Sequence, residues 1–433
     1  MIAILVQIQI YVFFESEEEM IVKTKEYGGK CSCGSIHDVY TELCVIEAGC
    51  LGRINEYLMQ YGLSGYCTAV YDTNTYNAKG LIRPGADQEV ILSAYNLHAD
   101  DQNVEIAMNR IADQAEFLIA VGSGTIHDIT RYCAYKKGIP FVSCPTAASV
   151  DGFCSSVAAM TWQGHKKTIT AVAPKIVLAD MNVIAQAPMR LTRSGFGDMV
   201  GKYIALSDWK VARILTQEYY CSKISTMMEE ALNTVVENFQ GIVKGNAFAY
   251  EKLTYGLLLS GIAMQLIGNS RPASGAEHHI SHIIEMEPAG LAIHSDALHG
   301  EKVGVGTILI SREYHRLAET KAIQWNDYSE IDSELVLKLF GSQVGETVLQ
   351  ENQKDSLAEV TAETIETHWE EICNIISEIP QTEELLKIYR QIGAKESLTD
   401  IGVSEEILPE LLNYSPYVRN RLTLMRVRRL LNA

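Results

Sequence analysis

The stretch Phe117–Thr146, FLIAVGSGTIHDITRYCAYKKGIPFVSCPT, decides the fold class. It begins and ends with short apolar runs, and a glycine-rich turn followed by a helical pattern lies between them. A strand, a turn, a helix and a strand in this order are typical of a β-α-β unit with two parallel strands. Ligands of such sheets bind beyond the carboxyl ends of the strands, which is where this turn lies.

The same alternation continues on both sides of the unit, from residue 41 to about residue 180. Between the strands, Leu51–Tyr61 and Asn103–Gln114 have amphipathic helical patterns, and a helix begins near Thr125. The pattern predicts a Rossmann-like α/β domain with a parallel sheet over residues 21–180. The expected strands are Thr68–Tyr71, Glu89–Leu92, Phe117–Val121, Phe141–Cys144 and Ile176–Leu178.

After Asp180 the strand-like runs become rare and helical periodicities dominate. We therefore expect a second, all-helical domain over residues 181–433, of the dehydroquinate synthase-like kind, that binds metal and substrate. The clearest helical patterns are Ile224–Phe239, Tyr250–Leu266, Leu335–Leu339, Ser356–Ile379 and Tyr417–Leu431.

Residues 1–20 have a different character. The stretch MIAILVQIQIYVFF is apolar but too short to span a bilayer, and it lacks the basic region and cleavage site of a signal peptide. We interpret it as an N-terminal extension of uncertain role, with Met1 or Met20 as the start of translation.

Composition excludes several classes of function. The chain has 433 residues, of which 47% are hydrophobic and 21% are charged, as in a globular enzyme with two domains. Its formal net charge of -18 argues against a nucleic-acid partner, because phosphate backbones require surplus Lys and Arg. No stretch reaches transmembrane length, so we expect a soluble protein without a membrane span.

The 10 cysteines are scattered along the chain, which indicates free thiols in a reducing cytoplasm. Cys31, Cys33 and His37 place three soft ligands close together in sequence and are compatible with a small metal site. Because no second cysteine pair with matching spacing follows, a turn without metal is the favoured interpretation.

The glycine-rich turn has features of a dinucleotide site. Gly122 and Gly124 allow backbone amides to approach a pyrophosphate, and the helix that follows directs its positive end there. His127 stands where the Rossmann fingerprint has its third glycine, so a plain turn is an open alternative. Thr146–Ser149 follows the next strand with small and hydroxyl side chains. Asp72 ends an earlier strand and suits either a ribose contact or an Asx turn.

Three separated residues suit a divalent metal: Asp198, His278 and His299. One carboxylate and two imidazoles leave a tetrahedral ion one open position, as in catalytic sites. His278 and His282 lie four residues apart and share a helix face, whereas His279 points elsewhere and suits a hydrogen-bonding or surface role. Asp198 has an alternative as a helix N-cap.

Two further sets of cationic residues bear on a phosphate ligand. Arg271 and Lys202 lie nearest the motifs in sequence, although each equally suits a pair with a surface carboxylate. The last part of the chain is basic and suits phosphate, a membrane surface or, by preference, docking on the acidic body or a partner subunit. Its arginines are Arg419, Arg421, Arg426, Arg428 and Arg429.

Five motifs together resemble the sn-glycerol-1-phosphate dehydrogenase family, a branch of the iron-containing alcohol dehydrogenase and dehydroquinate synthase-like superfamily. The resemblance covers about residues 40 to 310, and PTAASVDG and HGEKVGVG are its most specific parts. The motifs are GSGTIHD, PTAASVDGFCSS, GFGDMVGK, SGAEHHISH and HGEKVGVGT, beginning at residues 122, 145, 195, 274 and 299.

The resemblance implies the following roles. Zinc, nickel or iron is held by Asp198, His278 and His299, while Asp151, Asp198 and His282 contact the substrate. The metal polarises the ketone of dihydroxyacetone phosphate, which NADH or NADPH reduces to sn-glycerol 1-phosphate, a precursor of lipids. The expected partners are this small substrate and a second copy of the chain in a cytoplasmic dimer. The expected dinucleotide contacts are Gly122, Ser123, Gly124, Thr125, Ile126, Thr146, Ala147, Ala148, Ser149 and Ser155, with Asp72 added from the strand pattern.

Other functions remain open at this point. A glycerol or other polyol dehydrogenase uses a similar metal triad without a phosphate pocket. Dehydroquinate synthase is disfavoured by Asp198, where that family tends to have Glu, and by the few Lys and Arg residues around the motifs. A non-catalytic regulator has no need of both a triad and a cofactor turn.

Overall fold

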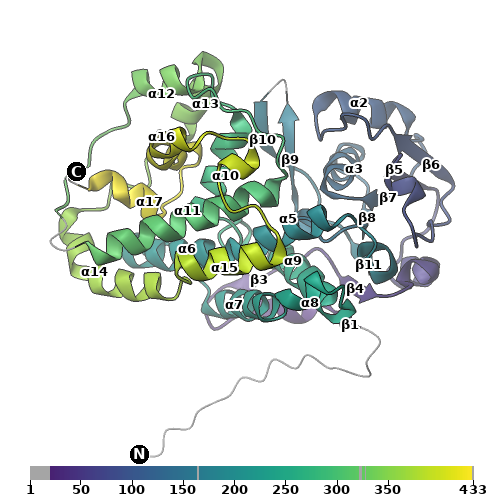
Figure 1. The fold of residues 1–433 in the computed structure, drawn as a ribbon. Coiled ribbons are helices and arrows are strands. Elements are labelled where there is room, and N and C mark those ends of the chain that lie inside the picture. The colour runs from purple at the N-terminus through teal and green to yellow at the C-terminus, as the bar shows by residue number, and fades with distance from the viewer. Residues whose placement is uncertain (1–19, 163–164, 321–323, 327, 432–433) are drawn as a thin grey trace, which may run out of the picture.

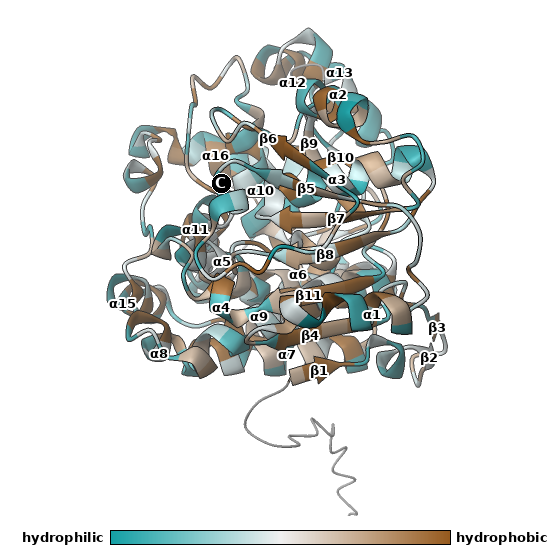
Figure 2. Cartoon of the chain, turned by 90° about the vertical axis from the view of Figure 1, so that its right-hand side faces the viewer, coloured by the Kyte–Doolittle hydropathy of each residue, from teal (hydrophilic) through white to brown (hydrophobic). Residues whose placement is uncertain are grey.

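The fold is built on one mostly parallel sheet. The computed structural model describes residues 20–162, 165–320, 324–326 and 328–431. Seven strands pair in the order β1-β4-β11-β8-β7-β5-β6, with β1 antiparallel to β4 and the other neighbours parallel. Figure 2 shows this order from bottom to top. The strands are β1 (Met20–Val22), β4 (Leu43–Glu47), β5 (Cys67–Asp72), β6 (Gln88–Leu92), β7 (Phe117–Gly122), β8 (Phe141–Pro145) and β11 (Ile176–Asp180).

All five strands expected from the sequence are confirmed within one or two residues at each end. Residues of β5, β7, β8 and β11 are buried throughout, which explains why their sequences read as continuous apolar runs. The strands β1 and β4 of the sheet escaped prediction. Two hairpins escaped it as well, because their strands are short or contain Ala and Lys, which rarely signal strands. They are β2 (Gly29–Lys30) with β3 (Ile36–His37) and β9 (Val157–Trp162) with β10 (His165–Thr170).

Helices cover the sheet between its strands. The helix expected over Leu51–Tyr61 is a 3-10 turn at Cys50–Arg53 followed by α1 (Ile54–Gln60). The helix expected over Asn103–Gln114 is α2 (Asp101–Arg110), which Asp100 caps and which ends before Ile111. The helix expected near Thr125 is α3 (Gly124–Lys137).

The chain after the sheet is helical, and Figure 1 shows this part beside the sheet. The patterns at 224–239, 250–266 and 335–339 are confirmed, and the pattern at 356–379 forms a helix only from Ala362. These helices are α4 (Met181–Ile184), α5 (Met189–Val200), α6 (Lys202–Thr216), α7 (Ser222–Glu237), α8 (Phe239–Val243), α9 (Ala247–Ile267), α10 (Ala276–Met286), α11 (His299–Glu319), α12 (Ser333–Phe340), α13 (Ser342–Glu351), α14 (Ala362–Ser377), α15 (Thr382–Ile392), α16 (Leu408–Tyr414) and α17 (Leu424–Val427).

The prediction of a long helix over Tyr417–Leu431 is wrong. Only α17, a single turn, and short 3-10 segments form there. The arginines of this stretch bond to acidic side chains elsewhere in the chain. Arg426 is fully buried and donates to Asp355 and to the carbonyl groups of Pro416 and Arg419. The expectation that this stretch docks on the acidic body is confirmed by these bonds and by the ion pair of Arg428 with Glu313.

The sheet and the helical region meet at Asp180. This residue ends β11, and its carboxylate accepts hydrogen bonds from the backbone N–H groups of Gly49, Leu51 and Asn182. The division into domains at 21–180 and 181–433 stays a prediction. The N-terminal extension lies outside the described residues up to residue 19. Among those described, no helix is both long and apolar enough to cross a membrane, and all 10 cysteines are free.

We expect Arg426→Ala to lower the free energy of unfolding by about 3–5 kcal/mol, because it removes a partner from the buried Asp355 carboxylate. Urea titration followed by circular dichroism measures this loss. Arg390→Ala is the matched control, since Arg390 pairs with Glu396 at the surface and its loss costs about 1 kcal/mol or less. Equal effects of the two substitutions would contradict the structural role of Arg426.

Candidate metal centre

Three helices bring the predicted metal ligands together. Asp198 comes from α5, His278 from α10 and His299 from the first residue of α11. One ligand atom of each lies within 4.8 Å of those of the others. His278 Nε2 is 3.6 Å from Asp198 Oδ1, and the His278 and His299 ring centroids are 5.3 Å apart. The prediction that these three side chains converge is correct. The alternative of a helix N-cap for Asp198 is wrong, because this residue lies inside α5.

Close backbone packing explains the glycines of the motifs. A Cβ on Gly197 would overlap the carbonyl oxygen of Gly300, and a Cβ on Gly300 would overlap that of Ser194. A Cβ on Gly306 would lie 2.6 Å from the carbonyl oxygen of Glu277. The glycines therefore let α11 lie directly against α5 and α10, and this contact carries His299 to the other two ligands.

Two carboxylates orient the imidazoles. His278 Nδ1 lies 2.6 Å from Glu277 Oε1, and His299 Nδ1 lies 2.9 Å from Glu285 Oε1. Because an ionised carboxylate only accepts, each Nδ1 carries a proton and each Nε2 is left for a metal. A histidine ligand that donates to a carboxylate is the usual outer arrangement of metal sites. The donor set of two imidazoles and one carboxylate fits zinc and related divalent ions.

A buried lysine neutralises the carboxylates of the site. Lys202 Nζ is 3.0 Å from Asp198 Oδ1 and 2.8 Å from Asp151 Oδ2, and its side chain is fully buried. Burial raises the pKa of Asp198, but Lys202 and the two histidines outweigh this effect and lower the pKa to about 2. Asp151 also accepts from Ser260 Oγ at 2.8 Å, and its N–H donates to Asp198 Oδ2 at 3.0 Å. Asp151 and Asp198 are therefore coupled into one site.

The remaining histidines of α10 differ in their surroundings. The His282 ring centroid is 6.0 Å from that of His278 and 6.1 Å from that of His299, so His282 borders the triad. Burial lowers the pKa of His282 well below its ordinary value. The hydrogen-bonding or surface role expected for His279 is wrong. This residue is 1% exposed, and neither of its ring nitrogens has a hydrogen-bond partner among the described residues.

The glycine-rich turn lies at the carboxyl edge of the sheet. Gly122 ends β7 opposite Pro145 of β8, so the turn and the segment Thr146–Ser149 are neighbours. Thr146 N donates to Gly122 O at 3.0 Å, and a Cβ on Gly122 would lie 2.6 Å from the Ile126 side chain. His127, in place of the third glycine, is buried and contacts Ser123 O through Nδ1 at 2.9 Å. The turn is thus held next to the residues expected to bind the dinucleotide.

Two expected cofactor residues have structural bonds of their own. Asp72 Oδ1 accepts from the N–H groups of Asn74 and Thr75 at 2.7 and 2.9 Å, which forms the Asx turn considered above. Ser155 Oγ bonds to the backbone of Val157 at 3.0 Å. The roles of Asp72 and Ser155 toward a dinucleotide stay predictions.

The expected phosphate-binding cations are already paired. Arg271 is 3% exposed and forms a bidentate ion pair with Glu218. Lys202 is fully buried between Asp151 and Asp198. For both residues the alternative of a carboxylate partner is correct, although for Lys202 the partners belong to the metal centre instead of the surface.

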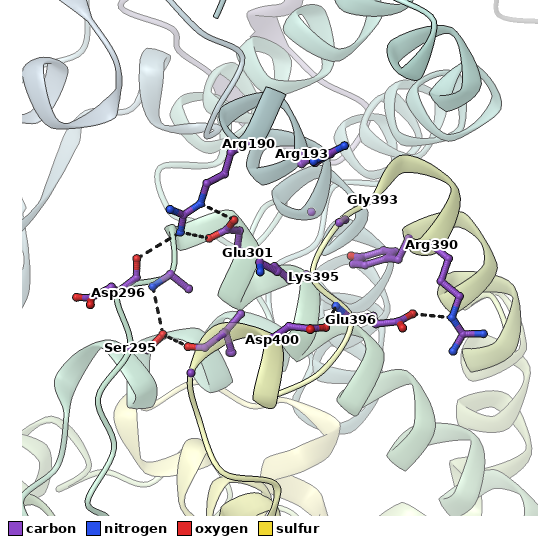
Figure 3. A pocket seen from close by; sticks show the side chains of 18 of the residues that line it. Arg190, Arg193, Ser295, Asp296, Glu301, Arg390, Gly393, Lys395, Glu396 and Asp400 are labelled. Atoms are coloured by element: carbon purple, nitrogen blue, oxygen red, sulfur yellow. Dashed lines mark hydrogen bonds and ion pairs between the residues drawn. The ribbon is translucent and has the colours of Figure 1, made fainter. Parts of the chain in front are cut away.

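Figure 3 shows a large cavity in the helical region. It measures about 890 Å³ and lies between α5, α11 and α15. Gly197 and Gly300 line it, but the metal ligands beside them in sequence do not. Its charges balance, since Arg190 pairs with Glu301 and Arg390 pairs with Glu396. The cavity therefore offers neither the metal nor the surplus positive charge that a phosphorylated substrate needs.

Sequence reasoning missed the residues that surround the triad. Glu277 and Glu285 lie next to the histidines in α10, and this acidic pattern around histidines was a usable signal. Ser260 comes from α9 and has no local signal, because only the tertiary fold brings it to Asp151.

Metal binding is expected to strengthen as the pH rises. Burial opposes a charge on His299, but Glu285 outweighs this effect and raises the pKa of His299 above its ordinary value of about 6.5. A proton on Nε2 excludes a metal, so the metal affinity should increase as the pH rises through the pKa of His299. Calorimetric titration with Zn²⁺ should show this rise in affinity in the wild type. Glu285→Gln should weaken Zn²⁺ binding roughly 10- to 100-fold, because it alters the group that orients His299. An affinity that is independent of pH and of Glu285 would contradict the site.

Comparisons with known proteins show the family of the chain. A family model described as iron-containing alcohol dehydrogenase matches residues 45–188. The glycerol-1-phosphate dehydrogenase of Bacillus licheniformis is 32% identical over 422 residues, 94% of this chain and 94% of that protein. That of Halalkalibacterium halodurans is 32% identical over 94% of this chain and 97% of that protein. The crystal structure of maleylacetate reductase from Rhizobium sp. strain MTP-10005 has a TM-score of 0.58 at 17% identity and covers 91% of this chain and 96% of that one, which supports the fold. The chain belongs to the glycerol-1-phosphate dehydrogenase family of the iron-containing alcohol dehydrogenase superfamily.

Proposed function

We propose that the protein catalyses the reversible reduction of dihydroxyacetone phosphate to sn-glycerol 1-phosphate with NADH or NADPH. The observation that carries the proposal is the convergence of Asp198, His278 and His299, with one ligand atom of each within 4.8 Å of the others, in a chain of this family. A divalent ion held there supplies a Lewis acid at a substrate oxygen.

The protein's own groups prepare the site for this chemistry. Lys202 keeps Asp198 ionised and ready as a ligand, since its ammonium lowers the pKa of that carboxyl against the effect of burial. Asp151 shares the same ammonium and offers an acceptor for a substrate hydroxyl. The Asp151 carboxylate has no hydrogen to donate to a phosphate, so we expect the phosphate to bind other residues.

His282 orients the substrate as a neutral imidazole. Burial lowers its pKa, so at pH 7 it is uncharged and offers one N–H donor and one acceptor. A neutral imidazole is a weak acid. Water is therefore the better source of the proton that completes the alcohol, with His282 holding the hydroxyl in place.

The dinucleotide lies, in this proposal, across the turn Gly122–Ile126 and the segment Thr146–Ser149. The N-terminus of α3 would offer its free N–H groups to the pyrophosphate of a bound dinucleotide. Asp72 ends β5, which pairs with β7, so its carboxylate is available near the ribose hydroxyls.

Arg419 is our candidate for the phosphate contact. Its side chain is 36% exposed, its Nη1 lies 3.5 Å from Glu351 Oε1 in an exposed ion pair, and its Nη2 donates to Thr168 Oγ1 of β10 at 2.6 Å. Because this pair is exposed, a phosphate can compete with Glu351 for the guanidinium. The preceding segment Ser415–Val418 packs on α10, and the positive charge of Arg419 contributes to the lowered pKa of His282 after burial. Arg419 thus supplies positive charge on the side of the triad where His282 lies.

The activity is tested with purified protein stripped of metal and reloaded with Zn²⁺, Ni²⁺ or Fe²⁺. NADH and NADPH oxidation should be fast with dihydroxyacetone phosphate, slow with dihydroxyacetone, and absent after chelation. We expect His278→Ala to lower kcat/KM at least about 100-fold, more than the loss of an outer-shell partner. His279→Leu is the matched control, since His279 lies beside His278 but does not face the other ligands. Equal rates with the unphosphorylated substrate, or activity that survives chelation, would contradict the proposal.

The phosphate contact is tested separately. Arg419→Ala should raise KM for dihydroxyacetone phosphate about tenfold, or about 1.4 kcal/mol, and leave KM for dihydroxyacetone unchanged. Arg390→Ala, which removes an exposed arginine elsewhere, should change neither constant. If the two substrates respond equally to Arg419→Ala, this residue does not bind the phosphate.

A further inference from the structure

A second group of side chains of the kinds that bind metals gathers around the hairpin of β2 and β3. Cys31, Cys33 and His37 meet Cys221, which immediately precedes α7. Their ligand atoms all lie within 4.8 Å of one another. We interpreted this stretch from the sequence as a turn without metal. The fourth side chain, Cys221, is 190 residues away from Cys31, and nothing in the sequence around it indicates that the two meet. This cluster shares no residue with the triad.

The hairpin presents its ligands on one side. Gly29 pairs with His37 and Lys30 with Ile36, so the two cysteines lie in the turn that joins the strands. Cys31 N donates to Ser35 O, and Gly34, at a φ of +90°, donates its N–H to Cys31 O. Ser32 and Gly34 are exposed, whereas both cysteines are partly buried. The turn thus directs the thiols inward, toward the protein.

The histidine is prepared as a ligand. His37 is 3% exposed, and its Nδ1 lies 2.7 Å from the carbonyl oxygen of Leu266 in α9. A carbonyl only accepts, so Nδ1 carries the proton and Nε2 has its lone pair free. That nitrogen lies 3.3 Å from Cys33 Sγ. A backbone carbonyl bound to the outer nitrogen is the arrangement that fixes a zinc-ligating histidine.

The spacing of the donors matches a tetrahedral ion. Zinc–sulfur bonds of about 2.3 Å at tetrahedral angles place two sulfurs about 3.8 Å apart. Cys31 Sγ and Cys221 Sγ are separated by 3.7 Å. The buried pair of Cys44 and Cys154 has a similar separation of 3.9 Å, but it has no third or fourth ligand among the described metal-binding groups. Among the described residues, the hairpin cluster is therefore the one group with four donors.

We propose that Cys31, Cys33, His37 and Cys221 bind one Zn²⁺ in a closed structural site, distinct from the metal of Asp198, His278 and His299. Four protein ligands leave no position for a substrate, so this ion stabilises the fold and takes no part in the reaction. It fastens the β2–β3 hairpin to the start of α7 and, through His37, to the end of α9.

Cobalt substitution tests the proposal, because thiolate ligands give Co²⁺ a charge-transfer absorption that a site of Asp and His lacks. The full-length wild type loaded with Co²⁺ should show this band, and His299→Ala should keep it. Cys33→Ser and, independently, Cys221→Ser should lose it, together with about one equivalent of zinc per chain in the purified protein. Cys373→Ser is the matched control, since this thiol lies in α14 outside the cluster, and it should keep the band.

Three results would overturn the proposal: no thiolate band in the wild type, a band of full strength in both Cys33→Ser and Cys221→Ser, or a disulfide between Cys31 and Cys221 in the purified chain. Two variants are used because Cys221 is buried and its substitution could disturb folding. Cys33 is only partly buried, so Cys33→Ser tests the site without that risk. Failure here is separate from failure of the proposed reaction, because turnover of dihydroxyacetone phosphate is measured with different variants.

Discussion

One ammonium group holds the proposed catalytic centre together. Lys202 lies between the carboxylates of Asp151 and Asp198, within 2.8 and 3.0 Å. Two buried carboxylates that share one ammonium lie close enough to repel each other, and burial disfavours the charge on each of them. The lysine offsets this cost and joins the segment after β8 to the helices α5 and α6. The ligand geometry of Asp198 depends on this bridge.

The second constraint is the contact between helices. Gly197, Gly300 and Gly306 remove the side chains that would otherwise separate α5, α10 and α11. The motifs GFGD and HGEKVGVG therefore have two physical parts: a ligand that binds the metal, and glycines that bring the ligand's helix into place. The carboxylates Glu277 and Glu285 then fix the orientation of the imidazoles.

Much of this could be predicted from the sequence, and the remainder has a clear physical cause. Parallel strands such as β7 are buried on both faces, so they can be recognised in the sequence as continuous apolar runs. Helical phase correctly separated His278 from His279. Tertiary contacts determined the rest. Arg426 bonds to the buried Asp355, 71 residues away, in the stretch where the expected C-terminal helix does not form, and Cys221 joins its cluster across 190 residues. The interior position of Asp198 in α5 was likewise invisible, because a cap and a ligand have the same local sequence.

Hydride transfer from the nicotinamide to the ketone carbon is the central claim, and isotope labelling measures it directly. The metal-loaded protein is incubated with dihydroxyacetone phosphate and NADH that carries deuterium at C4 on both faces of the nicotinamide. NMR of the product should show one deuterium at C2 of glycerol 1-phosphate. A product whose C2 hydrogen comes from solvent, or the absence of glycerol phosphate in metal-replete protein, would contradict the account.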